Sequence, residues 1–425
     1  MIAAAVERCA GIDVGKQILA VTVMIGPLEG EPRVEQRMFG TNVQDLEQLR
    51  EWLVKEAVTH CVMESTGSYW KPVFNVLESS VKVYLANGEE VKNRKGHKTD
   101  RKDGWWLAHL LRHAMIHPGF IPPVAVRELR DLTRRRKKVL GDGVAEKNRV
   151  QKILEDANVK LGNVLSDVFG TSGQLMLEAL LEGGKNPGEI AELAKRRARN
   201  RIPEITATLE GHRMSDHHRR MIRFSLDHMK FLDEQMERLD EAIAAQIEKA
   251  GLKEVWKLLQ TVPGVQEKSA ANILAETGGD MATFPTSRKL SSWAGVCPGN
   301  YESAGTRKHA STNRGNPWLK STLTECAWAA AAKKNCFIKD EFWRIAAKHG
   351  GKKAPAVIAV GHTLIRIVHR VLSTKLPFQE TKNDLQPAKK EKLIRHHVRR
   401  LGTLGVRVHH SVLRRTATQN PSPEA

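Results

Sequence analysis

Residues 9–24 read CAGIDVGKQILAVTVM, and this stretch decides the fold of the N-terminal third. Two apolar, β-branched runs, Cys9 to Val14 and Gln17 to Met24, flank the pair Gly15-Lys16, a pattern that predicts a β-hairpin. A further strand around Arg33 to Phe39 would complete a meander. The chain is therefore expected to begin with three neighbouring strands.

Helices and strands are expected to alternate after this meander. Leu46, Leu49 and Leu53 recur at spacings of three and four, which is typical of a helix. The expected order is a helix over 43–56, a strand over 60–63, a helix over 68–77, a strand over 81–86 and a helix over 99–115. This order describes a mixed α/β domain.

Four carboxylates lie in these strands or at the start of the last helix. Asp13 interrupts an apolar strand, where a charge is costly unless it is paired or binds a metal. Glu64 follows an apolar strand directly, at the carboxyl end where open α/β sheets bind ligands. Asp100 and Asp103 are spaced i,i+3 and project from one helix face. Ligation by oxygen alone favours Mg²⁺ or Mn²⁺.

Structural roles stay open for the single acids. The helix dipole could favour Asp100 near an N-terminus, and Asp103 could be a solvated surface residue. Basic residues surround Asp100, among them Lys98 and Arg101, so a phosphate backbone could be held beside the carboxylates. Nucleases and polymerases use two metal ions over a phosphodiester in this way.

The charge balance points to a polyanionic partner. The 425 residues suggest two or three domains, and 68 Lys and Arg against 48 Asp and Glu give a net charge of +20. No apolar run of membrane-spanning length and no signal peptide is found in the sequence, so we expect a cytoplasmic, nucleoid-associated protein without a membrane partner. The five scattered cysteines lack a CxxC pair and are expected to be reduced.

Long helices are expected in the middle of the chain. A basic helical pattern runs from Arg127 to about Lys160. Apolar residues from Ile222 to Ile243 recur close to a heptad seam, which predicts a coiled coil. A packed hairpin within one chain and an intersubunit bundle both remain open. Between these helices lie a loop over 183–188 and the basic run Lys195 to Arg201.

The C-terminal third contains two segments that could contact nucleic acid. Residues 258–278 resemble a helix-hairpin-helix, in which Pro263 and Gly264 would expose backbone N–H groups to a phosphate, although an ordinary turn is an equal alternative. The Gly-rich segment 293–320 contains Ser303, which from its neighbours alone is a loop serine. Its basic residues are Arg307, Lys308, Arg314 and Lys320.

Four motifs occur in a specific order along the chain: GIDVGK over 11–16, MESTGSYWKPV over 63–73, KTDRKDGWWLAHLLRH over 98–113 and PGNYESAGTRKHASTNRGNPWLK over 298–320. Together they resemble the DEDD-type transposases of the insertion-sequence 110 and 1111 family, over about Cys9 to Leu372. Two departures are Gly104, where Ala is common, and Lys320, where Arg is frequent.

The resemblance implies a RuvC-like (RNase H-like) N-terminal domain whose metal ligands are Asp13, Glu64, Asp100 and Asp103, with Mg²⁺ or Mn²⁺ as cofactor. It implies that Ser303 is a nucleophile forming a covalent 5′-phosphoserine intermediate. It also implies site-specific DNA recombination guided by a structured bridge RNA that pairs with target and donor DNA. Assembly as a dimer of dimers would join the carboxylates of one protomer to the serine of another.

The expected organisation has four parts. These are a RuvC-like catalytic domain over 1–125, a helical coiled-coil region over 126–250, a mostly α transposase domain with the helix-hairpin-helix over 251–375, and a basic tail over 376–425. Two alternative functions are a two-metal resolvase-like nuclease without a covalent intermediate and a non-catalytic nucleic-acid-binding scaffold.

Overall fold

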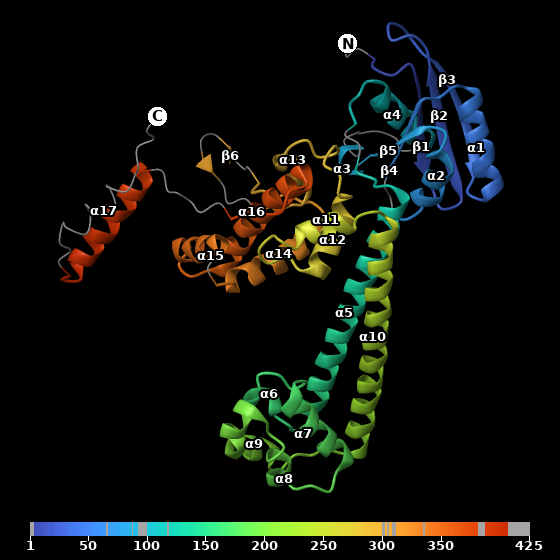
Figure 1. Ribbon diagram of the computed structural model, residues 1–425. Coiled ribbons are helices and arrows are strands. Elements are labelled where there is room, and N and C mark those ends of the chain that lie inside the picture. The colour runs from blue at the N-terminus through green and yellow to red at the C-terminus, as the bar shows by residue number, and fades with distance from the viewer. Residues whose placement is uncertain are drawn as a thin grey trace.

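The computed structural model describes residues 4–64, 67–86, 88–91, 100–116, 119–299, 302–303, 306–307, 312–334, 336–380 and 387–406. At residues 89–90, 100–101, 302–303, 306–307, 387–393 and 396 only the backbone is described. A sheet domain and a helical C-terminal lobe lie side by side, and a long helical arm projects from between them (Figure 1).

The N-terminal sheet has five strands, β1 (Arg8–Val14), β2 (Ile18–Ile25), β3 (Arg33–Gly40), β4 (His60–Glu64) and β5 (Lys82–Ala86), in the order β3-β2-β1-β4-β5. The meander β1-β2-β3 is antiparallel, whereas β4 and β5 run parallel to β1. The mixed α/β domain expected from the sequence is thus confirmed.

Helices cover both faces of this sheet. On one face α1 (Val43–Lys55) and α2 (Trp70–Leu77) pack against a core that includes Ile12 and Met63. On the other face α4 (Asp100–Arg112) packs against Cys9 and Val62. Both faces of β1 and β4 are covered, which explains why these strands read as continuous apolar runs.

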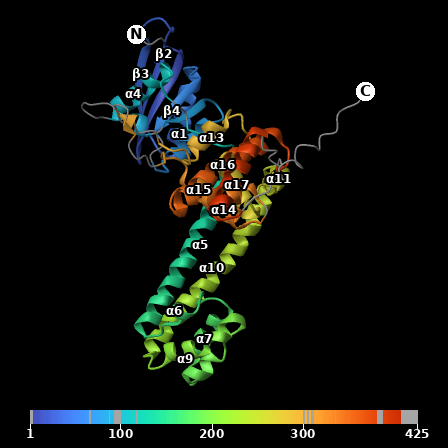
Figure 2. The same cartoon turned by 90° about the vertical axis from the view of Figure 1, so that its left-hand side faces the viewer.

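The arm consists of two long helices, α5 (Val124–Asp156) and α10 (Asp216–Lys249), which pack antiparallel along their length (Figures 1 and 2). Ile222, Leu232 and Ile243 of the expected apolar seam are buried between them or at their ends. The two helices form a packed hairpin within one chain. An additional bundle between subunits stays a prediction.

A small helical domain, which we call the head, closes the far end of the arm. It contains α6 (Leu161–Val164), α7 (Thr171–Glu182), α8 (Pro187–Ala191), the 3₁₀-helix η1 (Arg196–Arg201) and α9 (Ile202–Leu209). Its core includes Met176, Leu180 and Ile205. The sequence did not reveal this domain, because its helices are too short to show a clear hydrophobic period.

The C-terminal lobe is mostly helical. It contains α11 (Lys253–Leu259), α12 (Glu267–Thr277), α13 (Ser287–Trp293), the short strands β6 (Glu302–Ser303) and β7 (Thr306–Arg307), α14 (Pro317–Ala332), α15 (Phe337–Lys348) and α16 (Lys353–Thr374). Of the described helices, α16 alone is long and apolar enough to cross a membrane, and half of its apolar window is buried in this lobe. All five cysteines are free, and Cys297 is the one that is not buried.

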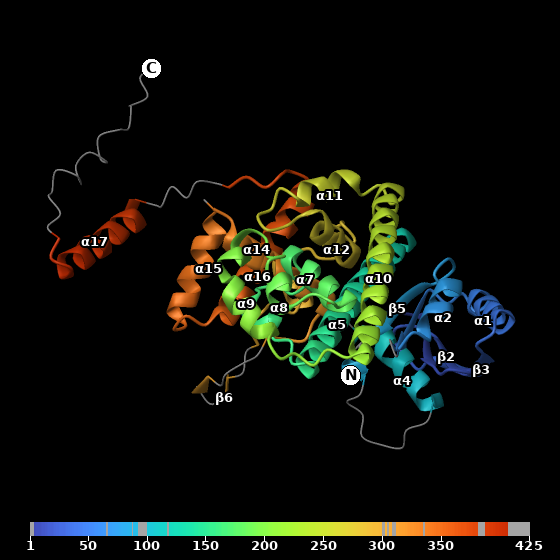
Figure 3. The ribbon, with the colours of Figure 1, turned by 90° about the horizontal axis from the view of Figure 1, so that it is seen from below.

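A last helix, α17 (Pro387–Thr403), lies apart from the rest of the molecule (Figures 1 and 3). It belongs to the basic tail predicted from the sequence.

Candidate active site

Asp13 and Glu64 lie on one face of the sheet, on neighbouring parallel strands. In the parallel pairing of β1 with β4, Ile12 lies opposite Met63. The next residues, Asp13 and Glu64, are therefore neighbours at the carboxyl ends of the two strands. Ile12 and Met63 belong to the core under α1 and α2. Because side chains alternate along a strand, both carboxylates project toward the opposite face, which α4 covers. The predicted proximity of these two acids is thus consistent with the register.

The first turns of α4 approach the same strands closely. A Cβ built on Gly11 would lie 2.2 Å from the carbonyl oxygen of Gly104 and 2.3 Å from the backbone nitrogen of Ala108. A Cβ on Gly104 would lie 2.8 Å from the carbonyl oxygen of Ala20, the residue that pairs with Asp13. The helix therefore crosses β1 and β2 with backbone nearly touching backbone. Glycine at 104 has a packing reason that the sequence did not show.

This crossing brings the start of α4 toward the two strand carboxylates. Asp103 directly precedes Gly104, and Asp100 begins the helix one turn earlier. Asp13, Glu64 and Asp103 are each half-buried. The side chain of Asp100 lies outside the described part of the chain.

A second glycine contact lies beside Glu64. The N-terminal residue of α3 (Gly88–Val91) is Gly88, and a Cβ built there would lie 2.6 Å from Glu64 Oε1. The start of α3 therefore confines the Glu64 carboxylate against the sheet edge. Neither this contact nor the α3 segment was singled out from the sequence.

Arg112 fixes the opposite end of α4. Its side chain is 2% exposed. Its Nη1 donates to the carbonyl oxygens of Val6 and Glu7, and its Nη2 donates to that of Pro27 at 2.5 Å. The guanidinium thus ties the end of α4 to the chain before β1 and after β2. Sequence reasoning missed Arg112, because a basic residue in a helix is usually a surface residue.

The donor set suits a hard divalent cation. Carboxylate oxygens are the ligands that Mg²⁺ and Mn²⁺ prefer. Among the side chains that the structure describes, no three His, Cys, Asp or Glu groups are close enough to be recognised as a metal site. The structure thus does not gather Asp13, Glu64 and Asp103 into a three-acid cluster. The side chain of Asp100 is not described, and the four-acid ligand set of Asp13, Glu64, Asp100 and Asp103 stays a prediction.

Ser303 lies in the C-terminal lobe, on a short hairpin. In that hairpin Ser303 of β6 pairs with Thr306 of β7. Figures 1 and 3 place this hairpin well away from the five-stranded sheet. Within one chain, the structure does not bring Ser303 to the carboxylates.

The segment that carries Ser303 joins the rest of the lobe through residues 295–298 and 312–316, which we call the neck. The neck is closely packed. Gly295 has a φ of +69°, and a Cβ on Gly315 would lie 2.4 Å from the Gly295 nitrogen. Next to this contact the Asn313 N–H donates to the Cys297 carbonyl oxygen, and Pro298 and Thr312 form an isolated antiparallel β-bridge. The segment that carries Ser303 therefore leaves and re-enters the lobe at one fixed point.

A buried carboxylate, Glu276, supports this neck. Asn316 Nδ2 donates to Glu276 Oε2 at 2.7 Å, while Asn316 Oδ1 accepts from the N–H groups of Trp318 and Leu319 and caps α14. Arg134 of α5 donates to both Glu276 oxygens. Burial lowers the pKa of the neighbouring Arg130 to about 10, although the charge of Glu276 opposes this shift. Glu276 and Asn316 were also missed from the sequence.

The turn at Pro263-Gly264 packs inward. Pro263 is buried, and Gly264 has a φ of +82°. A Cβ on Gly264 would lie 2.3 Å from the Cys326 carbonyl oxygen of α14. Packing alone thus accounts for glycine in this turn. The helix-hairpin-helix and its phosphate contact stay predictions.

The other predicted nucleic-acid contacts are only partly described. Lys98 and Lys308 lie outside the described residues, as do the side chains of Arg101 and Arg307. Arg314 is exposed, whereas Lys320 is half-buried and donates to Thr312 Oγ1 at 2.5 Å. Lys320 therefore also braces the neck.

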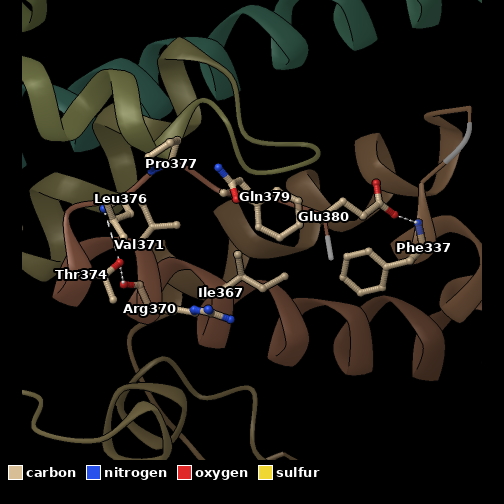
Figure 4. A pocket seen from close by; sticks show the side chains of 10 residues that line it. Phe337, Ile367, Arg370, Val371, Thr374, Leu376, Pro377, Gln379 and Glu380 are labelled. Atoms are coloured by element: carbon tan, nitrogen blue, oxygen red, sulfur yellow. Dashed lines mark hydrogen bonds between the residues drawn. The ribbon is translucent and has the colours of Figure 1, made fainter. Parts of the chain in front are cut away.

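A separate pocket lies in the C-terminal lobe, between α16 and the segment that leads to α17 (Figure 4). Ile367, Val371 and Phe378 form apolar parts of its lining, and Glu380 accepts a hydrogen bond from the Phe337 N–H at 2.8 Å. None of the predicted site residues lines this pocket.

Two family models match the chain. One, for DEDD transposases of IS110 type, carries the description "Transposase" and matches residues 10–159. The other is described as "Transposase IS116/IS110/IS902 family" and matches residues 256–341. The first match contains all four carboxylates, and the second contains Ser303. Together the two matches span more than half of the chain.

Solved structures similar to the chain include Thermus thermophilus RuvC, at 14% identity over 26% of this chain and 99% of that one, with a TM-score of 0.21. T. thermophilus RuvC in complex with a Holliday junction substrate is similar at 15% identity, with the same coverage and TM-score. A TM-score this low assigns neither fold nor activity. No curated protein sequence matches the chain significantly.

Proposed function

Because this chain belongs to the IS110 family of transposases, we propose that it cleaves and rejoins DNA strands at its carboxylate face, with Ser303 as nucleophile. The observation that carries the proposal is the placement of Asp13 and Glu64 at adjacent strand ends under the start of α4, which contributes Asp103. Asp100 is proposed as the fourth acid of this set.

The proposed cleavage is a displacement at phosphorus. The Ser303 hydroxyl loses its proton to a base as its oxygen attacks the phosphodiester, and the bond between phosphorus and the 3′ oxygen breaks. The departing 3′ oxygen takes up a proton from solvent and leaves as a 3′-hydroxyl. The 5′ phosphate stays bound to the serine, so attack by a new 3′-hydroxyl reverses the step and joins strands. A bound Mg²⁺ or Mn²⁺ would stabilise the charge that develops on the phosphate. The carboxylates of this chain would hold that ion in position.

The distance between the two halves of the site supports a composite arrangement. In one chain the Ser303 hairpin lies away from the sheet, so a serine from one protomer would have to meet the carboxylates of another. The proposed assembly is a dimer of dimers, in which the arm helices α5 and α10 are candidates for the intersubunit contact.

A structured bridge RNA is the proposed guide, pairing with both target and donor DNA. The surplus of 20 positive charges supports a large polyanionic ligand. Sequencing of RNA that copurifies with the protein tests this part: one structured species from the protein's own element is expected, and a random mixture of cellular RNA would contradict RNA guidance.

Complementation between two inactive variants tests the composite site. Asp13→Asn and Ser303→Ala proteins are each expected to be inactive on labelled DNA, and mixing them during assembly should restore covalent protein–DNA adduct on a denaturing gel. Ser292→Ala, in the exposed part of α13, is the matched control and should form adduct normally. Chelation of divalent ions should abolish adduct formation in every sample.

The same gels separate the alternatives. Normal cutting by Ser303→Ala without any adduct would favour a hydrolytic two-metal nuclease, an alternative favoured by the separation of Ser303 from the carboxylates in one chain. If neither Asp13→Asn nor Glu64→Gln changed any activity, the protein would be a nucleic-acid-binding scaffold.

A further inference from the structure

The head carries a concentrated basic surface that the proposed chemistry does not use. Residues 195–201 read KRRARNR, with five basic residues and no acid. The whole head, residues 157–214, contains eight basic and seven acidic residues, so its positive charge is gathered in this one segment. The segment also lies between the two stretches that the family models match.

Three arginines of this segment point into solvent from a docked helix. Arg196, Arg197 and Arg199 are exposed, whereas Ala198 is half-buried and packs against the head core. We call these three residues the head arginines. The 3₁₀-helix η1 thus presents several guanidinium groups on the outer side of a packed element.

The backbone that carries the head arginines is anchored at both ends. The Ser172 hydroxyl accepts from the Lys195 N–H at 2.9 Å and donates to the Lys195 carbonyl at 3.4 Å. At the other end, the Arg201 guanidinium bonds to the Val164 carbonyl and to Glu204. A fixed backbone lowers the entropy that binding would cost.

One head arginine occupies a backbone conformation that arginine rarely adopts. Arg196 has a φ of +51°, in the left-handed region where glycine or asparagine is usual. Such a conformation costs free energy and persists only where surrounding contacts hold it, as the Ser172 hydroxyl does for Lys195. An arginine thus stands where glycine would fit with less strain.

The head arginines differ from neighbouring arginines, which form ion pairs within the protein. Arg201 pairs with Glu204, and Arg219 pairs with Asp216. By contrast, Arg196, Arg197 and Arg199 form no ion pair with any residue that the structure describes. Clustered unpaired guanidinium groups repel one another, and phosphate groups relieve that repulsion through forked hydrogen bonds.

The position of the patch separates it from the carboxylate face. The 33-residue helix α5 has a length of about 50 Å, and the head lies at its far end (Figures 1 and 2). A phosphate backbone held at the head would therefore be a second, distant contact rather than part of the cleavage site.

We propose that the head arginines bind the phosphodiester backbone of a nucleic acid, without reading its sequence, and so extend the nucleic-acid footprint of each protomer along the arm. This inference does not depend on the roles proposed for Asp13 or Ser303. Backbone phosphate is the shared chemistry, and the test distinguishes RNA from DNA.

The test compares two charge-matched variants of the full chain. One is the triple variant Arg196→Gln, Arg197→Gln and Arg199→Gln. The control removes three scattered exposed charges of the same region, through Lys152→Gln, Lys185→Gln and Arg220→Gln. Fluorescence anisotropy measures Kd at several salt concentrations for a labelled 20-nucleotide RNA and for a labelled 20-base-pair DNA duplex. Thermal unfolding checks that both proteins are folded.

The head variant should bind about tenfold more weakly near physiological salt, and its slope of log Kd against log salt should fall by about 2 to 3, because each lost phosphate contact removes about 0.7 to 0.9. The control variant should have a Kd and a salt slope close to those of the wild-type protein. Arg197→Gln and Arg199→Gln alone should each lower the slope by about 1.

The probes identify the ligand. If the head variant loses affinity for the RNA alone, the head arginines bind RNA. If it loses affinity for the duplex alone, they bind DNA, and if it loses affinity for both, they bind backbone phosphate in general. Equal losses in the head variant and the control, or no loss in either, would overturn the proposal. A change in oligomeric state without a change in either Kd would overturn it in favour of a protein contact.

Discussion

Arg134 of α5 grips Glu276 of α12 through two parallel hydrogen bonds, from Nε and Nη2 to the two carboxylate oxygens, each 2.8 Å long. Glu276 is 2% exposed, and it also accepts from Asn316 at the neck of the Ser303 segment. Earlier in α5, Arg127 pairs with Glu78 at the end of α2 in the sheet domain. One helix thus connects the carboxylate domain to the base of the serine segment.

Loss of the Glu276 carboxylate should destabilise the C-terminal lobe. Glu276→Gln leaves the guanidinium groups of Arg130 and Arg134 without their counter-charge, so we expect a loss of about 3 kcal/mol in the free energy of unfolding. Urea unfolding followed by tryptophan fluorescence measures it, because Trp318 lies against Arg134. Glu254→Gln, at an exposed pair with Lys257, should change stability by less than about 1 kcal/mol. Equal losses in the two variants would contradict the role of the buried pair.

Gly104→Ala tests the close approach of α4 to the sheet. The added methyl would meet the Ala20 carbonyl oxygen at 2.8 Å, so we expect a loss of about 1–3 kcal/mol together with reduced DNA cleavage, because the helix that carries Asp103 must shift. Gly11→Ala should reduce the free energy of unfolding by more, since its two nearest contacts are backbone atoms at 2.2 and 2.3 Å.

Gly141→Ala is the matched control for these glycine variants. Gly141 lies inside α5 with nothing within 4 Å of the added methyl, so alanine should stabilise the helix by about 0.5–1 kcal/mol. Thermal unfolding of the three variants tests this: the unfolding temperature should fall in Gly104→Ala and Gly11→Ala and rise in Gly141→Ala. Stabilisation by Gly104→Ala would rule out the tight helix–sheet crossing.

The arm should lose a stabilising contact in acid. Burial favours a higher pKa for the Glu146 carboxyl, but hydrogen bonds from His228 and Ser225 and the charge of Arg149 outweigh it and hold the pKa below its ordinary value. A lowered folded-state pKa stabilises the protein above the ordinary value of about 4.5, and this contribution is lost as the pH falls through the folded-state pKa.

Comparison of wild type with Glu146→Gln between pH 3.5 and 7 measures this contribution. The difference in unfolding temperature should be constant above about pH 5.5 and shrink below about pH 4.5. A difference that grew as the pH fell would show that burial, not the hydrogen bonds, dominates.

Thiol reactivity should single out Cys297. Burial raises the pKa of Cys9 and Cys326 to about 11 and raises that of Cys61 further, and Cys336 is also buried. Burial raises the pKa of the partly exposed Cys297 as well, but this thiol is accessible. At pH 8 the native protein should therefore react with iodoacetamide at Cys297 alone, as mass spectrometry of peptides can show. Rapid native labelling of Cys61 would contradict the packing of β4.

The sequence by itself determined the sheet and the two strands that carry Asp13 and Glu64. Apolar β-branched runs around Asp13 and Glu64 predicted β1 and β4 nearly to the residue, because a strand that is buried on both faces leaves a continuous apolar run in the sequence. Ser303 was found from motif order and family resemblance rather than from any local physical signal.

Only the tertiary structure decided how these residues are held and how far apart they lie. Gly104, Arg112 and Glu276 show no local pattern that reveals their roles, because each contacts a partner distant in sequence. The head was hidden because short helices gain their stability from packing rather than from a periodic pattern of their own. The separation of Ser303 from the carboxylates likewise follows from how α5 joins two packed lobes, and sequence spacing does not encode that distance.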